Sequence, residues 1–389
     1  MSVPAPEPEP APEPVPVVLP RTFPLPALEV EDAIAVQFRL LECTAAHFRG
    51  EELFTADAGV VPGPGRPRAT ARVESVLADF FGAGDAALVQ GAGTGAVRAA
   101  LDTLHALPGA GAPPRLLIHS APAYRTTATT LRGMAVERAE ADFNDPAAVR
   151  TALARSGARW AFLQHSRQRL ADSYDLAGVL ALCAEAGVRT IVDDNYAALR
   201  VPACGVQLGA DASAFSLFKL HGPEGVGVVV GAPDLVGRVR ADNYSGGGQV
   251  QGHQALEVLR ALTHVPVMWA IQSRVTREVA DRLDAGEVAG VAQARVANAQ
   301  DRCVLVRLDR PVARRLPAVA AGLGAAPWPV GAGSRYEIAP LVYRLSASAL
   351  ADAPELADWT VRVNPMRAGA DLVVGLLGRA IGALYGSGD

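Results

Sequence analysis

The chain has 389 residues, a formal net charge of −4 at pH 7 and an isoelectric point near 6.0. This balance excludes a strongly basic surface for nucleic acid and a polybasic patch for a membrane, and no apolar run is long enough to span a bilayer. The N-terminus lacks the basic and apolar pattern of a secretion signal, so we expect a cytoplasmic protein. The four cysteines stand far apart, without the spacing of a metal site or a disulfide framework.

The chain opens with a tail and a helical segment. Residues 1–20 repeat Pro, Glu and Ala, a composition that cannot build a core and predicts a disordered or polyproline-like tail. Apolar residues at helical spacing follow within residues 27–58, and we assign residues 21–60 to an N-terminal helical segment. A Gly- and Pro-rich loop at 61–68 then leads to another helix at 71–81.

From about residue 85 onward, strands and helices alternate. Expected strands lie at residues 86–89, 115–119, 160–164, 190–192, 213–218 and 226–230. Expected helices lie at residues 94–107, 126–131 and 175–186. This alternation predicts a largely parallel sheet whose two faces are covered by helices, and we assign residues 61–285 to one large α/β domain.

A second, smaller domain is expected at the C-terminus. Helices predicted at 251–262 and 267–283 lead out of the large domain. Strands follow at 303–308, 341–345 and 360–363, with a closing helix at 370–384. This order favours a small α+β domain over residues 286–389.

One basic residue differs from all the others. The chain has 36 basic residues, and Lys219 is the only lysine among them. A general bias toward arginine explains most of this pattern, but a guanidinium cannot form an imine, whereas a lysine amine can lose its proton and attack a carbonyl. Lys219 ends an apolar run, where loss of solvent would lower its pKa and favour the free amine.

A glycine-rich turn precedes the first helix of the large domain. The segment GAGTGA (91–96) lies between an expected strand and an expected helix, a place where backbone N–H groups and the helix dipole bind phosphate. The segment also fits the dinucleotide pattern G-x-G-x-x-A. However, the acidic residue expected about 20 positions later is missing from PGAGAPPR (108–115). A purely structural tight turn is an equally good reading of this motif taken alone.

An acidic residue and a serine stand near the same expected sheet edge. Asp193 directly follows a buried strand in TIVDDNYAAL (190–199), and the carboxyl ends of parallel strands are where α/β sheets bind ligands. For the neighbouring Asp194 we expect a helix cap or a solvated acid. Ser216 lies three residues before Lys219 and could reach the same ligand.

Taken together, these residues resemble the fold-type I enzymes that use pyridoxal 5'-phosphate (PLP), the aspartate aminotransferase superfamily. The order of glycine loop, aspartate and lysine matches, and the resemblance covers roughly residues 55–385. The run FSLFKLHGPEGVGVVVG (215–231) is similar to the F-S-x-x-K-L-x-G-P-x-x-G run of the class V aminotransferase-like and selenocysteine-synthase-like branch. The resemblance implies a three-layer sandwich with a mostly parallel sheet, a small C-terminal α+β domain, PLP as cofactor and a homodimer.

The resemblance also implies roles for individual cofactor-binding residues. Lys219 forms the Schiff base, and Asp193 holds the pyridinium nitrogen, which lets the ring act as an electron sink. Tyr124 stacks on the ring, although a partly buried core tyrosine is an equal alternative. Tyr196 hydrogen-bonds the phenolic oxygen of the cofactor. The phosphate is held by Gly93, Thr94, Gly95 and Ser216.

Other positions depart from the family pattern or match it less well. LQHSRQR (163–169) stands where many relatives carry Asn-Pro, which makes Gln164, His165 and Ser166 candidates for the vacated role. In NYSGGGQVQG (243–252), Ser245 and Gly246 reach the neighbouring subunit's phosphate, or the segment is a flexible connector. The substrate is bound by Arg362 and Arg367 through its carboxylate, with His221 lining the pocket; a surface role is the alternative for either arginine.

The function that follows is an enzyme acting on a small amino acid through an external aldimine with PLP, with Lys219 moving the α-proton. The missing Asn-Pro and the run around Lys219 favour elimination or replacement at the side chain. Tyr196 and Arg362 are equally compatible with an aminotransferase that uses an α-keto acid acceptor. A nucleotide-dependent oxidoreductase and a non-catalytic regulator are more distant alternatives, because the chain lacks the acidic nucleotide partner and has no added DNA-binding domain.

Overall fold

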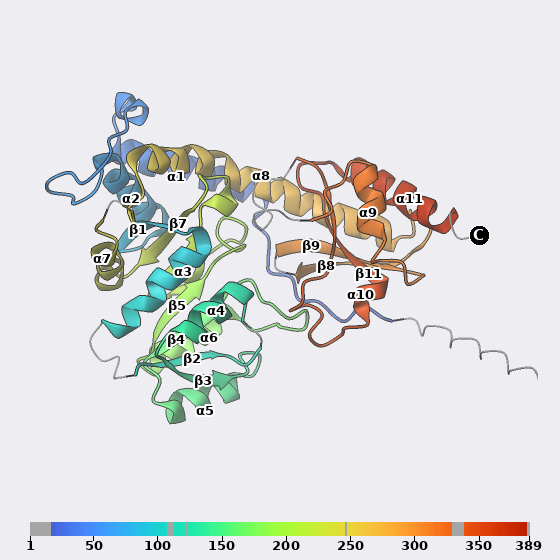
Figure 1. The fold of residues 1–389 in the computed structure, drawn as a ribbon, viewed down its shortest axis with the longest axis horizontal. Coiled ribbons are helices and arrows are strands. Elements are labelled where there is room, and N and C mark those ends of the chain that lie inside the picture. The colour runs from blue at the N-terminus through green and yellow to red at the C-terminus, as the bar shows by residue number, and fades with distance from the viewer. Residues whose placement is uncertain are drawn as a thin grey trace, which may run out of the picture.

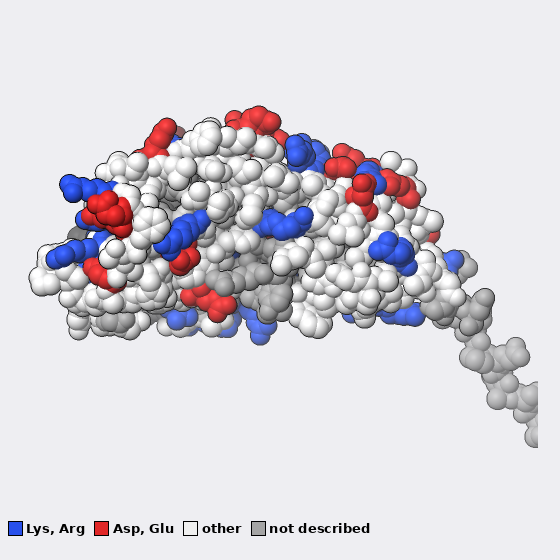
Figure 2. Space-filling model, turned by 90° about the horizontal axis from the view of Figure 1, so that it is seen from above, with Lys and Arg blue, Asp and Glu red and all other residues white. Residues whose placement is uncertain are grey.

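The computed structural model describes residues 17–106, 113–121, 123–245, 247–299, 301–328 and 338–386. Within them the chain forms two lobes, each built around its own sheet, and the long helix α8 runs from one lobe into the other (Figure 1). On the face that Figure 2 shows, acidic and basic side chains are interspersed, and neither sign gathers into a large patch. None of the described helices has both the length and the apolar character needed to cross a membrane.

The large lobe contains a seven-stranded sheet in the order β1-β7-β6-β5-β4-β2-β3. Its strands are β1 (Asp85–Gln90), β2 (Arg115–His119), β3 (Glu137–Ala141), β4 (Trp160–Gln164), β5 (Arg189–Asp193), β6 (Ala212–Ser216) and β7 (Val226–Gly231). All neighbouring pairs are parallel except the two that β7 makes with β1 and β6. The sequence analysis missed β3, because this edge strand reads ERAEA and buries only its last residue.

Helices cover both faces of the large sheet. The helices of this lobe are α2 (Arg68–Phe81), α3 (Ala92–Asp102), α4 (Arg125–Gly133), α5 (Pro146–Ser156), α6 (Leu176–Glu185) and α7 (Pro233–Asp242), with short 3-10 turns η1 (Gly50–Phe54), η2 (Thr103–His105), η3 (Gly205–Leu208) and η4 (Phe218–Leu220). Side chains of α3, α4 and α7 bury one face, while α2, α5, α6 and part of α8 bury the other. The expected three-layer sandwich with a mostly parallel sheet is therefore confirmed.

The helix α8 (Gly252–Asp284) is continuous over 33 residues, although the sequence analysis expected two helices separated at Pro266. A proline inside a helix removes one backbone hydrogen bond and normally interrupts it. Here Pro266 is buried, and α1 (Val30–His47) lies along α8, so tertiary packing on both sides of the proline keeps the helix in register (Figure 1).

The small lobe contains a four-stranded antiparallel sheet in the order β10-β11-β9-β8. Its strands are β8 (Val291–Ala299), β9 (Asp301–Leu308), β10 (Leu341–Arg344) and β11 (Thr360–Asn364), and its helices are α9 (Leu316–Gly322), α10 (Leu356–Trp359) and α11 (Ala370–Gly386). Side chains of α9, α11 and the end of α8 bury one face of this sheet. The expected α+β character of this domain is confirmed, with β8 as an added strand that the sequence analysis missed.

A segment that precedes α1, which we call the N-terminal strap (residues 17–28), ties the two lobes together. Leu19 is buried in a cluster on the second face of the small sheet, where Leu170 of the large lobe also packs. Thr22 donates a hydrogen bond to Val296, and Leu28 donates one to Arg200 of the large lobe. The tail expected over residues 1–20 therefore ends earlier, because residues 17–20 pack against the small lobe; residues 1–16 lie outside the described residues.

The turn between β1 and α3 yields a prediction about stability. A Cβ atom on Gly95 would overlap the carbonyl oxygen of Gln90, a backbone atom that cannot move aside cheaply. We expect Gly95→Ala to lower the free energy of unfolding by about 1–3 kcal/mol, the usual cost of overpacking. Gly382→Ala in α11 is the matched control, because no atom lies within 4 Å of a Cβ there and alanine is the better helix former. Denaturant unfolding measures both; an unchanged Gly95→Ala would contradict the close approach.

Candidate active site

The residues singled out from the sequence gather at one edge of the large sheet. Asp193 ends β5, Ser216 ends β6, and α3 begins just beyond β1. They surround a pocket of about 290 Å³. The pocket is lined by Ala92, Gly93, Thr94, Val97, Tyr124, Thr126, Thr127, Thr130, Asp193, Asn195, Ser216, Phe218 and Lys219. The pocket thus joins the aspartate and the lysine to the glycine turn, which precedes them by about a hundred residues or more in the sequence.

Lys219 lies in the short turn η4, directly after β6. Its Nζ atom is 3.8 Å from the ring centroid of Tyr196 and 5.8 Å from that of Tyr124. Its backbone N–H donates to the Ser216 hydroxyl oxygen at 3.1 Å. Burial lowers the pKa of Lys219 to about 8, while the negative charge of Asp193 acts in the opposite direction. A buried amine with this pKa is substantially neutral near pH 8 and can act as a nucleophile or a base.

Asp193 is buried at the end of β5. Its carboxylate accepts two hydrogen bonds from Asn195, one from the backbone N–H at 2.9 Å and one from Nδ2 at 2.7 Å. Burial raises the pKa of Asp193, whereas these hydrogen bonds and the charge of Lys219 lower it. Asn195 also accepts a hydrogen bond from the backbone N–H of Ser216 at 3.0 Å, so one amide side chain connects the ends of β5 and β6.

Asn195 is a residue that the sequence analysis missed. Its signal was its place two positions after an aspartate that ends a strand, where an amide can fold back onto the carboxylate. The glycine turn makes room for it, because a Cβ atom on Gly93 would overlap the Asn195 side chain. Gly93 is therefore required at this position for close approach.

The start of α3 presents backbone donors to the pocket. Gly91 caps the helix with φ = 93°, a left-handed conformation that suits glycine. The N–H of Ala92 donates to the carbonyl oxygen of Gly225, and the N–H of Gly95 donates to that of Gly91. The N–H groups of Gly93 and Thr94 belong to the first turn, which has no intrahelical acceptor for them. Together with the helix dipole they suit an anionic group such as a phosphate.

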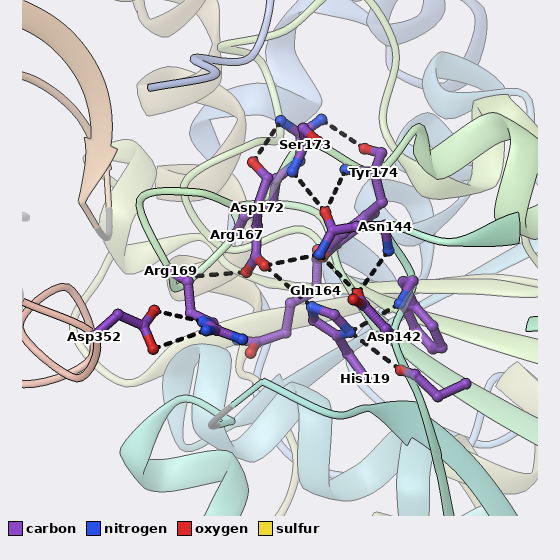
Figure 3. Close-up of polar contacts among 12 residues, drawn as sticks. His119, Asp142, Asn144, Gln164, Arg167, Arg169, Asp172, Ser173, Tyr174 and Asp352 are labelled. Carbon is purple, nitrogen blue, oxygen red and sulfur yellow. Dashed lines mark hydrogen bonds and ion pairs between the residues drawn. The ribbon is translucent and has the colours of Figure 1, made fainter. Parts of the chain in front are cut away.

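Gln164, which contacts Tyr124, belongs to a polar network with Tyr174, Asn144 and Asp172 (Figure 3). Its backbone N–H donates to the side-chain oxygen of Gln164 at 3.3 Å, and the Tyr174 hydroxyl donates to the backbone carbonyl of Gln164. Asp172 lies 3.2 Å from His119 and accepts a hydrogen bond of 3.2 Å from Asn144. The sequence analysis missed His119, Asn144 and Asp172, because each is an ordinary polar residue until the fold brings them together.

The segment after β4 also connects the two lobes. Arg169 makes a two-pronged ion pair with Asp352 of the small lobe, with N···O distances of 2.6 and 2.7 Å (Figure 3). Ser166 is buried in this segment and does not line the pocket around Lys219. Gln164 likewise contacts Tyr124 rather than lining that pocket.

Asp194 takes one of the two roles that we expected of it. We predicted a helix cap or a solvated acid, and the complete burial of Asp194 excludes the solvated acid. Its carboxylate lies 2.6 Å from Nδ1 of His165 and accepts a hydrogen bond from the backbone N–H of Gly205, the first residue of η3. It thus caps η3 from inside the protein and pairs with His165, because a buried carboxylate needs partners for both oxygens. His165 is consequently directed to Asp194 and is not among the residues that line the pocket.

Arg362 lies on β11 of the small lobe and is almost completely buried, with 2% of its surface exposed. Its guanidinium is 4.0 Å from Asp301 and 5.5 Å from the ring centroid of Tyr343. The charge of Arg362 also acts on Tyr196, where it lowers the hydroxyl pKa that burial raises. Arg362 is therefore close enough to Tyr196 for their charges to interact, although it is not among the residues that line the lysine pocket.

Arg367 forms a cluster with residues of the large lobe and α8. Its guanidinium lies 2.6 Å from Nε2 of His221 and 3.1 Å from the side-chain oxygen of Gln272. It also lies over the ring of Trp269 at 4.9 Å. Arg367 and His221 are thus brought together, but neither lines the pocket around Lys219, which His221 was expected to line.

Ser245 is exposed, and its carbonyl oxygen accepts hydrogen bonds from the backbone N–H groups of Gly248 and Gln249. Within one chain it does not line the pocket around Lys219. Gly246, the other residue expected to reach a neighbouring subunit, lies outside the described residues.

Comparison with known proteins places the chain in a family. A family model for the YhfS-like C-terminal domain matches residues 277–377, and the class-V aminotransferase model matches residues 125–268. The uncharacterized YhfS protein of Escherichia coli is 46% identical over 365 residues, which are 94% of this chain and 100% of that protein. The chain belongs to the YhfS family. The crystal structure of the E. coli YhfS protein, described as pyridoxal-5'-phosphate dependent, has a TM-score of 0.89 and covers 93% of this chain and 99% of that chain.

More distant solved structures share the fold with this YhfS-family chain. A cystathionine γ-lyase (CalE6) from Micromonospora echinospora has a TM-score of 0.67 at 20% identity, over 89% of this chain and 99% of that one. A cystathionine γ-synthase from Xanthomonas oryzae pv. oryzae has a TM-score of 0.65 at 18% identity, over 90% of this chain and 99% of that one. The expected resemblance to fold-type I PLP enzymes and to their class V aminotransferase-like branch is confirmed.

The single lysine allows a direct measurement of the site's electrostatics. We expect reductive methylation of Lys219 in the cofactor-free protein to reach half its maximal rate near pH 8, because only the neutral amine reacts and burial lowers its pKa to about 8. In denaturant the midpoint should rise toward that of a free lysine, about 10.4. Peptide mass analysis reads the modification at this one residue.

The variant Asp193→Asn tests the cause of the shift. Asp193 raises the pKa of Lys219, so removing its charge should move the labelling midpoint below that of the unaltered protein. Asp234→Asn is the matched control, because Asp234 is paired with Arg189 at the surface. A folded Asp193→Asn protein whose midpoint stays the same or rises would show that the two groups do not interact.

Proposed function

We propose that this YhfS-family chain is a PLP-dependent enzyme that acts on a small amino acid and eliminates or replaces a group on its side chain. The observation that carries the proposal is the pocket in which Lys219 meets Asp193 and the start of α3. Lys219 is the only lysine of the chain and is partly buried there. Burying an amine costs free energy, so a lysine is seldom buried unless its chemistry is needed there.

The residues present fit the cofactor. The N–H groups of Gly93 and Thr94, with Ser216 beside them, suit its phosphate. The buried carboxylate of Asp193 suits its pyridine nitrogen, and Asn195 holds that carboxylate in place. Tyr124 offers an aromatic face. When bound, PLP supplies an electron sink for the bonds at the α-carbon of an amino acid, which the side chains of this chain cannot provide.

Lys219 then has two tasks in the proposed reaction. As a neutral amine it would hold the cofactor, and its Nζ would take the proton from the substrate's α-carbon. The pKa of about 8 suits both tasks near neutral pH, because a base works best when its pKa lies close to the working pH. The tyrosine rings beside Nζ restrict where the amine can move and keep water from it.

The small lobe would supply substrate binding. Arg362 is held on a central strand of the small sheet, opposite Tyr196, where its guanidinium could bind the α-carboxylate of an amino acid. Tyr196 would contact the cofactor's phenolic oxygen. Arg367 with His221 would form the outer wall of the same cleft.

The preference for side-chain chemistry rests on two observations. The segment after β4 carries Gln164, His165 and Ser166 where many aminotransferases have Asn-Pro, and none of the three lines the lysine pocket. Solved structures with the same fold include a cystathionine γ-lyase and a cystathionine γ-synthase, which supports the same class. Transamination is the second candidate, because Tyr196 and Arg362 are equally suited to it.

The test is a comparison of wild type with Lys219→Ala and Lys219→Arg. We expect the purified wild-type protein to bind PLP with a visible absorption band and both variants to lose that band and at least a thousandfold of activity, since neither can form the imine. Lys219→Arg controls for charge, and melting curves confirm that each variant is folded. A wild-type protein that takes up no PLP would overturn the proposal.

Reaction type is tested by incubating the holoenzyme with a panel of small amino acids. Elimination should release a keto acid and ammonia without any acceptor, and replacement should require an added nucleophile. If keto acid forms only when an α-keto acid acceptor is present, the side-chain preference is wrong and the enzyme is an aminotransferase.

We further propose a homodimer in the cytoplasm, in which Ser245 and Gly246 contact the partner subunit's cofactor. The exposure of Ser245 supports this arrangement. The four cysteines, all free, suit a reducing compartment.

Subunit mixing tests the shared site. Lys219→Ala and Ser245→Trp should each be nearly inactive alone. In a mixed dimer, one site would combine the intact Lys219 of one subunit with the intact Ser245 of the other, so about a quarter of wild-type activity should return. Two Lys219→Ala preparations mixed together are the control. Failure of the mixture to regain activity, while exchange is shown by mass, would contradict the shared site.

A further inference from the structure

A second, smaller cavity lies behind Tyr196, between the N-terminal strap, α8 and the hairpin of β8 and β9. It measures about 20 Å³, which is room for one water-sized particle. It is lined by Leu25, Pro26, Ala27, Tyr196, Arg200, Val201, Trp269, Gln272, Ser273, Thr276, Asn298 and Arg302. Nothing in the proposed reaction uses this cavity.

The polar atoms around this cavity that have no partner are all hydrogen-bond donors. They are the indole Nε1 of Trp269, the Nδ2 of Asn298 and the Nε of Arg302, each buried and without an acceptor among the described residues. Trp269 and Asn298 are 3% and 7% exposed, so bulk water does not satisfy them. Leaving three buried donors unpaired is unfavourable, so an acceptor held in the cavity would stabilise them.

The three donors are held in place by the fold. Arg302 donates through Nη1 to the carbonyl oxygen of Leu25 in the strap at 2.8 Å, which positions its Nε. Asn298 and Arg302 are paired across β8 and β9. Trp269 is a residue of α8, and its ring packs against the guanidinium of Arg200, whose Cζ atom lies 3.5 Å from the ring centroid.

The charge around the cavity has one sign. Two guanidinium groups, those of Arg200 and Arg302, stand among its lining residues, and no carboxylate does so within the described part of the chain. Of the lining oxygens, the Gln272 side-chain oxygen accepts from Arg367, whereas the Thr276 hydroxyl donates to the backbone of Gln272 and keeps its capacity to accept. A water molecule would need acceptors for its two protons in this donor-rich cavity, whereas an anion needs donors only.

We propose that this cavity binds one small monovalent anion of halide size. The anion would accept from Trp269, Asn298 and Arg302 together and would offset part of the positive charge. The anion would lie beside Tyr196, where the N-terminal strap, α8 and the hairpin of β8 and β9 meet. Binding would therefore stabilise the arrangement of the two lobes, because it adds affinity to the folded state only. The proposal is independent of the proposed reaction.

The first test locates the anion. Crystals of the holoenzyme are grown without halide and soaked in sodium bromide, and an anomalous difference map is calculated. We expect a bromide peak within hydrogen-bond distance of Trp269 Nε1 and Arg302 Nε. A cavity that contains no anomalous density while bromide binds elsewhere would overturn the proposal and leave water as the occupant.

The second test measures affinity in solution. Melting temperature is followed as sodium chloride replaces sodium gluconate at constant ionic strength, since gluconate is too large for the cavity. We expect a saturable rise of roughly 2–4 °C. Equal melting temperatures in the two salts, at every chloride fraction, would contradict a specific site.

Variants connect the response to these residues. Asn298→Asp places a carboxylate in the cavity and should abolish both the bromide peak and the chloride response. Gln293→Glu is the matched control, because it makes the same charge change on β8 outside the cavity, and it should retain both. Should Asn298→Asp fail to fold, Trp269→Phe removes one donor and should weaken chloride binding roughly tenfold. A chloride response as strong in these variants as in wild type would refute the assignment.

Discussion

The structure depends on one electrostatic constraint, the burial of an amine and a carboxylate in the same pocket. Burial disfavours both charges: it lowers the pKa of Lys219 and raises that of Asp193, while each charge favours the other. The arrangement holds only if the surroundings are rigid. Asn195 supplies that rigidity, because its side chain joins the ends of β5 and β6, and Gly93 leaves the space that Asn195 occupies. The proposed cofactor chemistry therefore rests on backbone geometry as much as on the reactive side chains.

The boundary between the two lobes is the second organising feature. The helix α8 passes from one to the other, the N-terminal strap contacts both, and Arg169 pairs with Asp352 across the gap. The two arginines proposed to bind substrate come from the small lobe, whereas the residues proposed to bind cofactor come from the large one. The relative position of the lobes thus sets the distance between the proposed substrate-binding residues and the proposed cofactor-binding residues. The donor-lined cavity behind Tyr196 lies at the same junction.

Much of the large domain could be predicted from the sequence. Strands such as 115–119 and 160–164 were predicted with their observed bounds, because buried parallel strands are uninterrupted apolar runs between clear turn signals. The exposed strand β3 was missed, since ERAEA carries no such run. Pro266 predicted a break that packing along α8 overrides. Asp194 shows the same limit for a single side chain: nothing local distinguishes a solvated acid from one that is buried beside His165.

The sequence carried the resemblance to PLP enzymes. One lysine in an arginine-rich background, preceded by a glycine turn and a strand-ending aspartate, matches the order of residues in fold-type I enzymes, and only an amine such as that of lysine can form the imine. Tertiary structure decided which other residues belong with them. The network around Asp172 and the donor set of Trp269, Asn298 and Arg302 have no sequence signal, since their members come from distant segments. The sequence states the identity of each side chain, whereas its burial, the charges around it and its hydrogen-bond partners are decided only when the helices and strands pack together.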